Sequence, residues 1–150
     1  MNINILKTNS DNVDFIYLIK LLDEDLKEKY GDLQKQYDDY NRNKDIKQVL
    51  VIYRDNVPVG CGAYKEYKDK TVELKRIFID KKERGNGLGK LVVNTLEKCA
   101  KEKYYKYAIL ETGIKQNEAI HLYKRCGYTI ISNYGQYIGN TNSICMKKTL

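Results

Sequence analysis

An arginine followed by three closely spaced glycines is the part of this sequence best suited to chemistry. The segment reads Arg84-Gly85-Asn86-Gly87-Leu88-Gly89, and an amphipathic helical pattern starts directly after it. Glycines allow positive φ and carry no Cβ that would keep an anion away, and the first N–H groups of a helix have no intrahelical partners. The helix dipole adds partial positive charge there, which favours phosphate oxygens. The segment predicts a phosphate-binding turn, with a plain strand-to-helix turn as the alternative.

The spacing of these glycines narrows the kind of phosphate loop. A Walker loop needs Gly-x-x-x-x-Gly-Lys and then Ser or Thr, whereas Lys90 is followed by Leu91. A dinucleotide loop needs Gly-x-Gly-x-x-Gly after the first strand of a parallel unit, whereas Gly89 comes one residue too early. The pattern therefore does not fit an NTPase, and it disfavours NAD binding.

The charge balance suggests nucleic-acid binding as another use for basic residues. The 150 residues include 27 Lys and Arg against 20 Asp and Glu, a formal net charge of +7. Most of these basic residues are lysines, and the sequence has no arginine cluster or aromatic-basic platform. We interpret the excess as a lysine-rich surface and expect no nucleic-acid partner. No apolar run approaches the roughly 20 residues that cross a bilayer, so we expect a cytoplasmic protein without a membrane partner.

The cysteines could in principle hold a metal ion. Cys61, Cys99, Cys126 and Cys145 lie far apart, and His121 is the one imidazole in the sequence. A zinc site needs about four clustered ligands. We therefore expect buried, reduced thiols, no metal, and a histidine on a helix surface.

The elements around the glycine-rich turn must position it, and they alternate between strand and helix periods. Before it, residues 49–53, 57–67 and 71–80 predict three consecutive antiparallel strands. In the third of these, alternation places two sets of side chains on opposite faces: Leu74, Arg76 and Phe78 on one, and Glu73, Lys75, Ile77 and Ile79 on the other. After the turn comes a helix with an apolar stripe: Leu88, Leu91, Val92, Thr95, Leu96 and Cys99.

The N-terminal part predicts one strand and two helices. The strand covers residues 2–6, and Asp11 or Asn12 would cap the helix that follows. The buried stripe of that helix has five members: Phe15, Leu18, Ile19, Leu22 and Leu26. A second, more weakly apolar helix is expected over 33–40.

The C-terminal part completes a mixed sheet. It predicts a strand over 107–112, a helix over 117–126 closed by Gly127, and strands over 128–131 and 142–148. The fold class is therefore α/β (α+β mixed). We expect a single domain over 1–150, with a mostly antiparallel central sheet of about seven strands, four flanking helices and one right-handed crossover.

Two motifs together resemble the GCN5-related N-acetyltransferase (GNAT) superfamily. The stretch from Arg84 to Gly89 is similar to its pyrophosphate loop, Arg/Gln-x-x-Gly-x-Gly/Ala. Residues 117–128 resemble the family segment that ends in Ala-x-x-Leu-Tyr-x-x-x-Gly-Tyr/Phe, and residues 73–79 resemble its fourth strand. The resemblance implies transfer of an acetyl group from acetyl-CoA to a primary amine of a small molecule or polypeptide, directly within a ternary complex.

The resemblance also implies how acetyl-CoA is held. In this family the cofactor lies in a V-shaped splay between the fourth and fifth strands. The backbone of Ile77, Phe78 and Ile79 would pair with the pantetheine arm and polarise the thioester carbonyl. The turn from Arg84 to Lys90 would hold the pyrophosphate. Asn117 would contact the cofactor arm, with a role as helix cap as its alternative.

Catalytic roles follow from the same resemblance. Tyr123 occupies the position of the acid that protonates the departing CoA thiolate, and packing on the apolar helix face is its alternative. Glu73 and Glu111 compete as the base, directly or through water, and each could instead be an ordinary ion-paired glutamate. We prefer Glu73, because it falls where the histone-acetyltransferase branch carries its base. Tyr134 and Tyr137 would wall the acceptor pocket.

Two other classes of function are weighed against the enzyme. A non-catalytic CoA-binding or regulatory module would keep the turn and bind the cofactor without transfer. A nucleic-acid-binding protein is the weaker alternative and would show steeply salt-dependent affinity for DNA. An N-acetyltransferase of this kind could form a homodimer.

Overall fold

The computed structural model describes residues 2–31 and 45–150. Its strands are β1 (Ile3–Thr8), β2 (Ile46–Arg54), β3 (Val57–Lys68), β4 (Thr71–Ile79), β5 (Tyr107–Gly113), β6 (Thr129–Ile131) and β7 (Ser143–Thr149). Its helices are α1 (Val13–Tyr30), α3 (Leu88–Glu102) and α4 (Asn117–Arg125), with the short 3-10 helices η2 (Lys81–Glu83) and η3 (Gly135–Tyr137). The helix expected over 33–40 lies outside the described residues.

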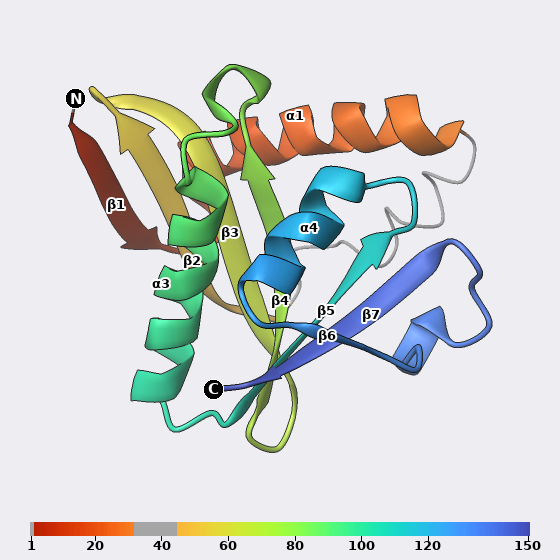
Figure 1. Cartoon of the computed structure of the whole chain (residues 1–150). Coiled ribbons are helices and arrows are strands. Elements are labelled where there is room, and N and C mark those ends of the chain that lie inside the picture. Colours follow the sequence, from red (N-terminus) through yellow and green to blue (C-terminus); the bar gives the residue numbers. More distant parts are fainter. Residues whose placement is uncertain (1, 32–44) are drawn as a thin grey trace.

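The seven strands form one sheet in the order β1-β2-β3-β4-β5-β7-β6, which confirms the mixed architecture (Figure 1). β4 and β5 are parallel, because α3 carries the chain back between them. The other neighbouring strands are antiparallel. The predicted meander of three strands is therefore β2, β3 and β4, and the predicted crossover runs from β4 to β5.

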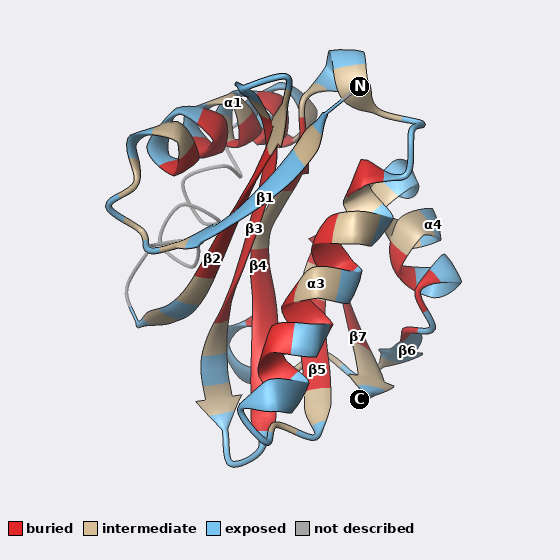
Figure 2. Cartoon of the chain, turned by 90° about the vertical axis from the view of Figure 1, so that its left-hand side faces the viewer, coloured by how far each residue is buried: buried red, intermediate tan, exposed pale blue. Residues whose placement is uncertain are grey.

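Helices cover both faces of the sheet and create two cores. α1 packs on one face, where the five members of its predicted stripe are buried together with Val51 and Phe78. α3 and α4 cover the other face, where Leu50 and Ile52 pack with Leu96. Neighbouring residues of β2 thus enter different cores, as the period of a strand requires. Figure 2 shows the central strands buried between the helical layers, whereas β1 at the sheet edge is largely exposed.

The ends of α1 follow the local signals in the sequence. The side chain of Asn12 accepts hydrogen bonds from the backbone N–H groups of Asp14 and Phe15, which makes it the expected N-cap. The helix stops at Gly31, whose φ is 56°. This conformation is accessible to glycine at little cost.

A β-bulge in β4 breaks the strict alternation that was expected there. The register passes from Ala63↔Lys75 to Cys61↔Phe78, so β4 contains one residue more than the facing part of β3. Arg76 lies in the bulge and has a φ of 57°. Arg76 and Phe78 both contact α1, whereas Leu74 lies in the core under α3. The prediction that Leu74 shares a face with Arg76 and Phe78 is therefore wrong.

The sequence also led to predictions about the cysteines, a metal site and membrane-spanning helices. The four cysteines are free and buried, as predicted. Within residues 2–31 and 45–150, no group of side chains is arranged to hold a metal ion. In the same ranges, none of the helices combines the length and apolar character needed to cross a membrane.

Candidate functional site

The parallel strands β4 and β5 separate partway along their length. Their ladder ends at Glu73↔Ile109, although β4 continues to Ile79 and β5 to Gly113. Beyond the ladder, β4 stays paired with β3, and β5 stays paired with β7. Figure 1 shows the two strands diverging toward the level at which α1 crosses. The V-shaped splay is confirmed, and it leaves two backbone edges facing each other without a ladder.

The glycine-rich turn lies at the rim of this opening and leads into α3. Gly87 is the N-cap of α3, with a φ of 80°, and no described side chain caps the first turn. Apart from chain neighbours, no described heavy atom comes within 4 Å of a Cβ built on Gly85 or Gly87. The N–H groups from Leu88 to Lys90 therefore begin a helix in front of open space, where partial positive charge collects.

Arg84 stands at the start of this turn and is held by the protein. Its Nε donates to the carbonyl oxygen of Ile79 at 2.8 Å, and its Nη2 lies 3.5 Å from the carboxylate of Asp25 in α1. The guanidinium also lies 5.5 Å from the centroid of the Phe78 ring. Asp25 is itself buried, at 9% exposure. The charge predicted to face phosphate is therefore partly balanced from α1, while the same contacts fix where the turn begins.

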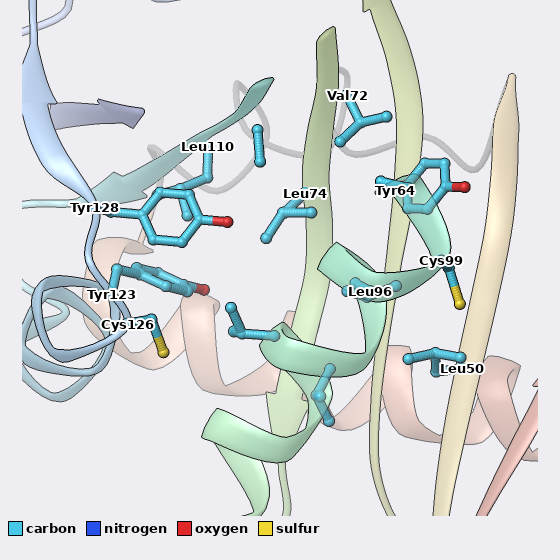
Figure 3. Packing of buried hydrophobic residues seen from close by; sticks show 14 of the residues in the cluster. Leu50, Tyr64, Val72, Leu74, Leu96, Cys99, Leu110, Tyr123, Cys126 and Tyr128 are labelled. Carbon is cyan, nitrogen blue, oxygen red and sulfur yellow. The ribbon is translucent and has the colours of Figure 1, made fainter. Parts of the chain in front are cut away.

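Tyr123 lies on the buried face of α4. It is 7% exposed, and its ring meets that of Tyr128 edge to face with centroids 6.1 Å apart. Figure 3 shows both rings in the core under α3 and α4, close to Cys126. Burial raises the pKa of Tyr123, with smaller contributions from Cys126 and Glu111. At neutral pH this phenol keeps its proton, so it can act as a donor.

The start of α4 does not use Asn117 as a cap. Asn117 is the first helical residue and is exposed, and Gln116 precedes it as N-cap. The side chain of Gln116 accepts hydrogen bonds from the N–H of Gly113 at 2.8 Å and from the hydroxyl of Thr112 at 3.2 Å. The alternative role of Asn117 as helix cap is therefore wrong, because the chain turns into the helix one residue earlier.

Close contact between α3 and α4 depends on Gly89. A Cβ on Gly89 would lie 2.9 Å from a methyl carbon of Leu122. The third glycine of the turn therefore serves packing between the helices, whereas Gly85 and Gly87 face open space. Lys90, on the next position, is exposed.

Glu73 lies on the opposite face of the sheet, because its neighbour Leu74 enters the core under α3. It is 2% exposed. The hydroxyl of Tyr134 donates to its Oε2 at 2.5 Å, and the Nζ atoms of Lys75 and Lys65 lie 3.6 and 3.8 Å from its Oε1. Burial lowers the pKa of Lys75, and the charge of Glu73 opposes this effect. Both oxygens of Glu73 thus have partners within the protein.

Glu111 lies on the same face as Glu73 and has a different environment. It is opposite Cys145 in the β5–β7 ladder, and the hydroxyl of Ser143 donates to its Oε2 at 2.6 Å. Burial raises the pKa of Glu111 to about 7, while Ser143 and Lys75 lower it and Glu73 raises it. A carboxyl group with this pKa exchanges its proton readily near neutrality.

The predicted pocket tyrosines come from the loop between β6 and β7 and lie beside these carboxylates. The ring centroids of Tyr134 and Tyr137 are 5.6 Å apart, and Tyr67 of β3 packs on Tyr134 at 5.1 Å. Tyr137 is 2% exposed, so it supports the other rings more than it offers contact surface. The amide of Asn133 donates to the carbonyl oxygens of Tyr137 and Asn140, which holds the loop in place.

α1 contacts both arms of the opening. On the β4 side, Asp23 lies 3.0 Å from Arg76 at the bulge. On the β5 side, a Cβ on Gly113 would lie 1.5 Å from the hydroxyl oxygen of Tyr30, so only glycine leaves room for this ring. The same hydroxyl accepts a hydrogen bond from the N–H of Lys115 at 3.2 Å.

Sequence reasoning did not identify four of the residues in this site. Lys75 could have been found, because residues two apart in a strand share a face and Glu73 was already a candidate. Lys65 could have been found from the register of the predicted hairpin, whereas Tyr67 and Ser143 carried no comparable signal. Lys65 is opposite Glu73 in the β3–β4 hairpin and Tyr67 lies on the same strand, whereas Ser143 reaches Glu111 through the pairing of β5 with β7, which are far apart in the sequence.

Comparison with known proteins gives a family match over most of the chain. The family model described as Acetyltransferase (GNAT) family matches residues 15–128. Among curated proteins, Probable N-acetyltransferase 14 of Xenopus tropicalis is 32% identical over 111 residues, which cover 73% of this chain and 53% of that protein. The chain thus spans about half the length of this relative.

Solved structures match the whole fold. A protein of Klebsiella pneumoniae subsp. pneumoniae MGH 78578, provisionally assigned as an acyl-CoA N-acyltransferase, superposes with a TM-score of 0.82 at 31% identity, covering 99% of this chain and 97% of that one. A GNAT family acetyltransferase from Elizabethkingia anophelis with acetyl-CoA bound has a TM-score of 0.75 at 20% identity, covering 99% of each chain. The second likeness concerns the fold alone.

Proposed function

This chain belongs to the acetyltransferase (GNAT) family, and from that membership we propose that it is an N-acetyltransferase. It transfers the acetyl group of acetyl-CoA to a primary amine of a small molecule or polypeptide, directly within a ternary complex. The N-acetyltransferase relative and the acetyl-CoA bound to the Elizabethkingia protein support this choice of donor.

The observation that carries the proposal is the opening between β4 and β5 with the glycine-rich turn at its rim. The unpaired strand edges offer hydrogen bonds to an extended arm, in the manner of an added strand. The open turn from Gly85 to Lys90 offers backbone N–H groups to a pyrophosphate. A ligand that joins an amide-containing arm to a pyrophosphate matches both features, and coenzyme A has this form.

The backbone of Ile77, Phe78 and Ile79 follows the bulge on the free edge of β4. We assign to it the pairing with the pantetheine arm and the polarisation of the thioester carbonyl. Because the bulge at Arg76 changes the direction of successive backbone groups, this segment differs from the regular ladder before it. Asn117 is exposed at the start of α4 and is assigned to the cofactor arm.

Proton donors and acceptors lie on opposite faces of the opening, and this separation suits acetyl transfer. We call the side with the glycine-rich turn and Tyr123 the cofactor face, and the side with Glu73, Glu111 and Tyr134 the acceptor face. On attack, the C–N bond forms and the C–S bond breaks. The proton lost by the amine passes to Glu111, and Tyr123 gives its proton to the departing thiolate.

Glu111 is favoured over Glu73 as the proton acceptor, although the resemblance to the histone-acetyltransferase branch had favoured Glu73. Glu73 is 2% exposed and bonded to Tyr134 and Lys75, so it balances charge and positions the loop. Glu111 is less enclosed, and its pKa of about 7 allows it to take a proton at neutral pH and release it again.

Calorimetry with acetyl-CoA and a screen of primary amines test the proposal. We expect micromolar binding of acetyl-CoA and amine-dependent release of free CoA thiol for at least one acceptor class. Tyr123→Phe should keep acetyl-CoA affinity and lose about a hundredfold in kcat, because it removes the proton donor and little else. Absence of acetyl-CoA binding would refute the proposal. Binding without transfer across the amine panel would favour the non-catalytic CoA-binding module.

A further inference from the structure

Ser143 shares a surface with Glu111 because of the register between β5 and β7. Glu111 is opposite Cys145, and Gly113 is opposite Ser143. Residues two apart in a strand lie on one face, so Ser143 is the diagonal neighbour of Glu111 on the acceptor face. Its hydroxyl donates to Oε2 of Glu111 at 2.6 Å, and Ser143 is 7% exposed. The hydrogen bond is therefore short and shielded from water.

The position of this hydroxyl is fixed from both sides. Across the ladder, Gly113 has no side chain, and the ring of Tyr30 occupies that space. On the chain side, the N–H of Ser143 donates to the carbonyl oxygen of Asn140 at 3.2 Å. Asn140 is itself held by the side chain of Asn133. The hydroxyl is thus supported by the loop that also carries the pocket tyrosines.

The other groups around Glu111 have opposing effects on its charge. They come from four elements: Glu73 and Lys75 on β4, Cys145 on β7, Tyr137 in η3, and Tyr123 on α4. Lys75 favours the carboxylate, and Glu73 disfavours it. Burial is the largest effect on the pKa of Glu111 and raises it, and the hydroxyl of Ser143 makes the largest contribution in the opposite direction.

We propose that Ser143 is a positioning residue that holds the Glu111 carboxylate in its ionised, proton-accepting form, an inference that rests on the role proposed for Glu111. A hydroxyl that donates to a carboxylate stabilises the charged form more than the neutral acid. The hydrogen bond also fixes which oxygen of Glu111 remains directed to the amine. Ser143 acts through Glu111 and does not itself exchange a proton with the acceptor.

The test compares the pH dependence of kcat/KM for the wild type and Ser143→Ala with one acceptor amine. Loss of the donor should move the rising limb that reports Glu111 upward by about one pH unit. The variant should therefore be several-fold slower at pH 7 and approach the wild-type rate near pH 9. Because the acceptor is the same, its own ionisation contributes equally to both curves.

Two further variants separate this role from a structural one. Ser143→Thr keeps the hydroxyl and should restore the wild-type limb, whereas Ser143→Cys, a weak donor of similar size, should give an intermediate shift. A pH-independent loss of rate in Ser143→Ala, or no rescue by Thr, would overturn the inference. Affinity for acetyl-CoA serves as the check on folding in each variant and should not change.

A measurement without turnover distinguishes failure of this inference from failure of the proposed function. The carboxyl carbon of Glu111 can be titrated by NMR in the wild type and in Ser143→Ala. An unshifted titration overturns the role of Ser143, whatever Glu111 does. The titration of Glu111 can instead shift in Ser143→Ala while Glu111→Gln keeps the wild-type pH dependence of kcat/KM. That result contradicts Glu111 as the base, and with it the catalytic part of the inference.

Discussion

The cofactor face and the acceptor face of the opening are built from different kinds of chemical group. On the cofactor face, binding depends on backbone: the N–H groups of the glycine-rich turn and the free edge of β4. On the acceptor face, side chains converge from β3, β4, β5, β7 and the loop before β7, and most are charged or phenolic. The first arrangement suits a constant ligand, because backbone geometry survives many substitutions. The second suits a reaction, because charges can be balanced one residue at a time.

The largest effect is expected on the acceptor face, from Glu111→Gln. The variant keeps the shape and loses the proton acceptor, so kcat should fall by about 10² to 10⁴ while the dissociation constant of acetyl-CoA stays the same. Steady-state kinetics and calorimetry measure the two quantities. Glu102→Gln, at the exposed end of α3, is the matched control and should change neither. Equal losses of rate and affinity would show that the two faces are not separable.

On the cofactor face, the corresponding substitution is Gly87→Val, which acts on the conformation of the backbone. A β-branched residue is strained at a φ of 80°, and its side chain would enter the space assigned to the pyrophosphate. Acetyl-CoA should bind at least about tenfold more weakly, with little change in kcat at saturation. Gly139→Val provides the control, because Gly139 has a φ of 82° and similar open space but lies in the loop before β7. Equal weakening in both variants would assign the effect to general loss of folding.

A smaller effect concerns stability. The pKa of Glu111 is raised to about 7 in the native protein, from an ordinary value of 4.5. Between these values the native state holds more protons than the unfolded chain, so stability falls as pH rises through this window. Glu111→Gln removes the group, and its stability relative to wild type should increase by about 2 to 3 kcal/mol from pH 5 to pH 8. Urea denaturation at both pH values measures this, and parallel behaviour of the two proteins would contradict it.

The smallest expected effect is that of Tyr134→Phe. The variant removes the hydroxyl that donates to the buried Glu73, while the ring contacts with Tyr67 and Tyr137 remain. The free energy of unfolding should fall by about 1 kcal/mol with no change in acetyl-CoA affinity. Tyr104→Phe, at a site that is 86% exposed, should be silent. Weaker acetyl-CoA binding by Tyr134→Phe would mean that the acceptor face also shapes the cofactor site.

The same difference explains how far the sequence could predict this site. The glycine-rich turn and the segment around Tyr123 are each a continuous stretch of sequence, so the spacing of residues within each can be recognised from the sequence alone. Glu73 and Glu111 were recognised as candidates, but their relative suitability depends on burial and on the partners Tyr134 and Ser143, which the sequence places far away. Choosing between them required the register of β5 against β7.

The fold shows a similar limit at one position. Hydrophobic periods and caps predicted the order of the strands along the chain and the start of α1, because those signals are local. The bulge at Arg76 could not be predicted in this way, because residues that adopt positive φ there are normally glycine or asparagine. Alternation fails from that residue onward, and with it the assignment of the following side chains to a face.

That bulge also determines how β4 can change in length. The bulge takes up its extra residue without changing the phase against β3, so Phe78 lies under α1 and Ile79 under α3. A deletion of one residue at Arg76 would restore regular pleating and leave Phe78 and Ile79 on their present faces, because alternation that continues directly from Lys75 gives the same phase. A one-codon deletion at Arg76 would therefore keep both layers of packing and would remove the bend in the strand edge that we assign to the cofactor, so the geometry of that edge can change independently of the two cores.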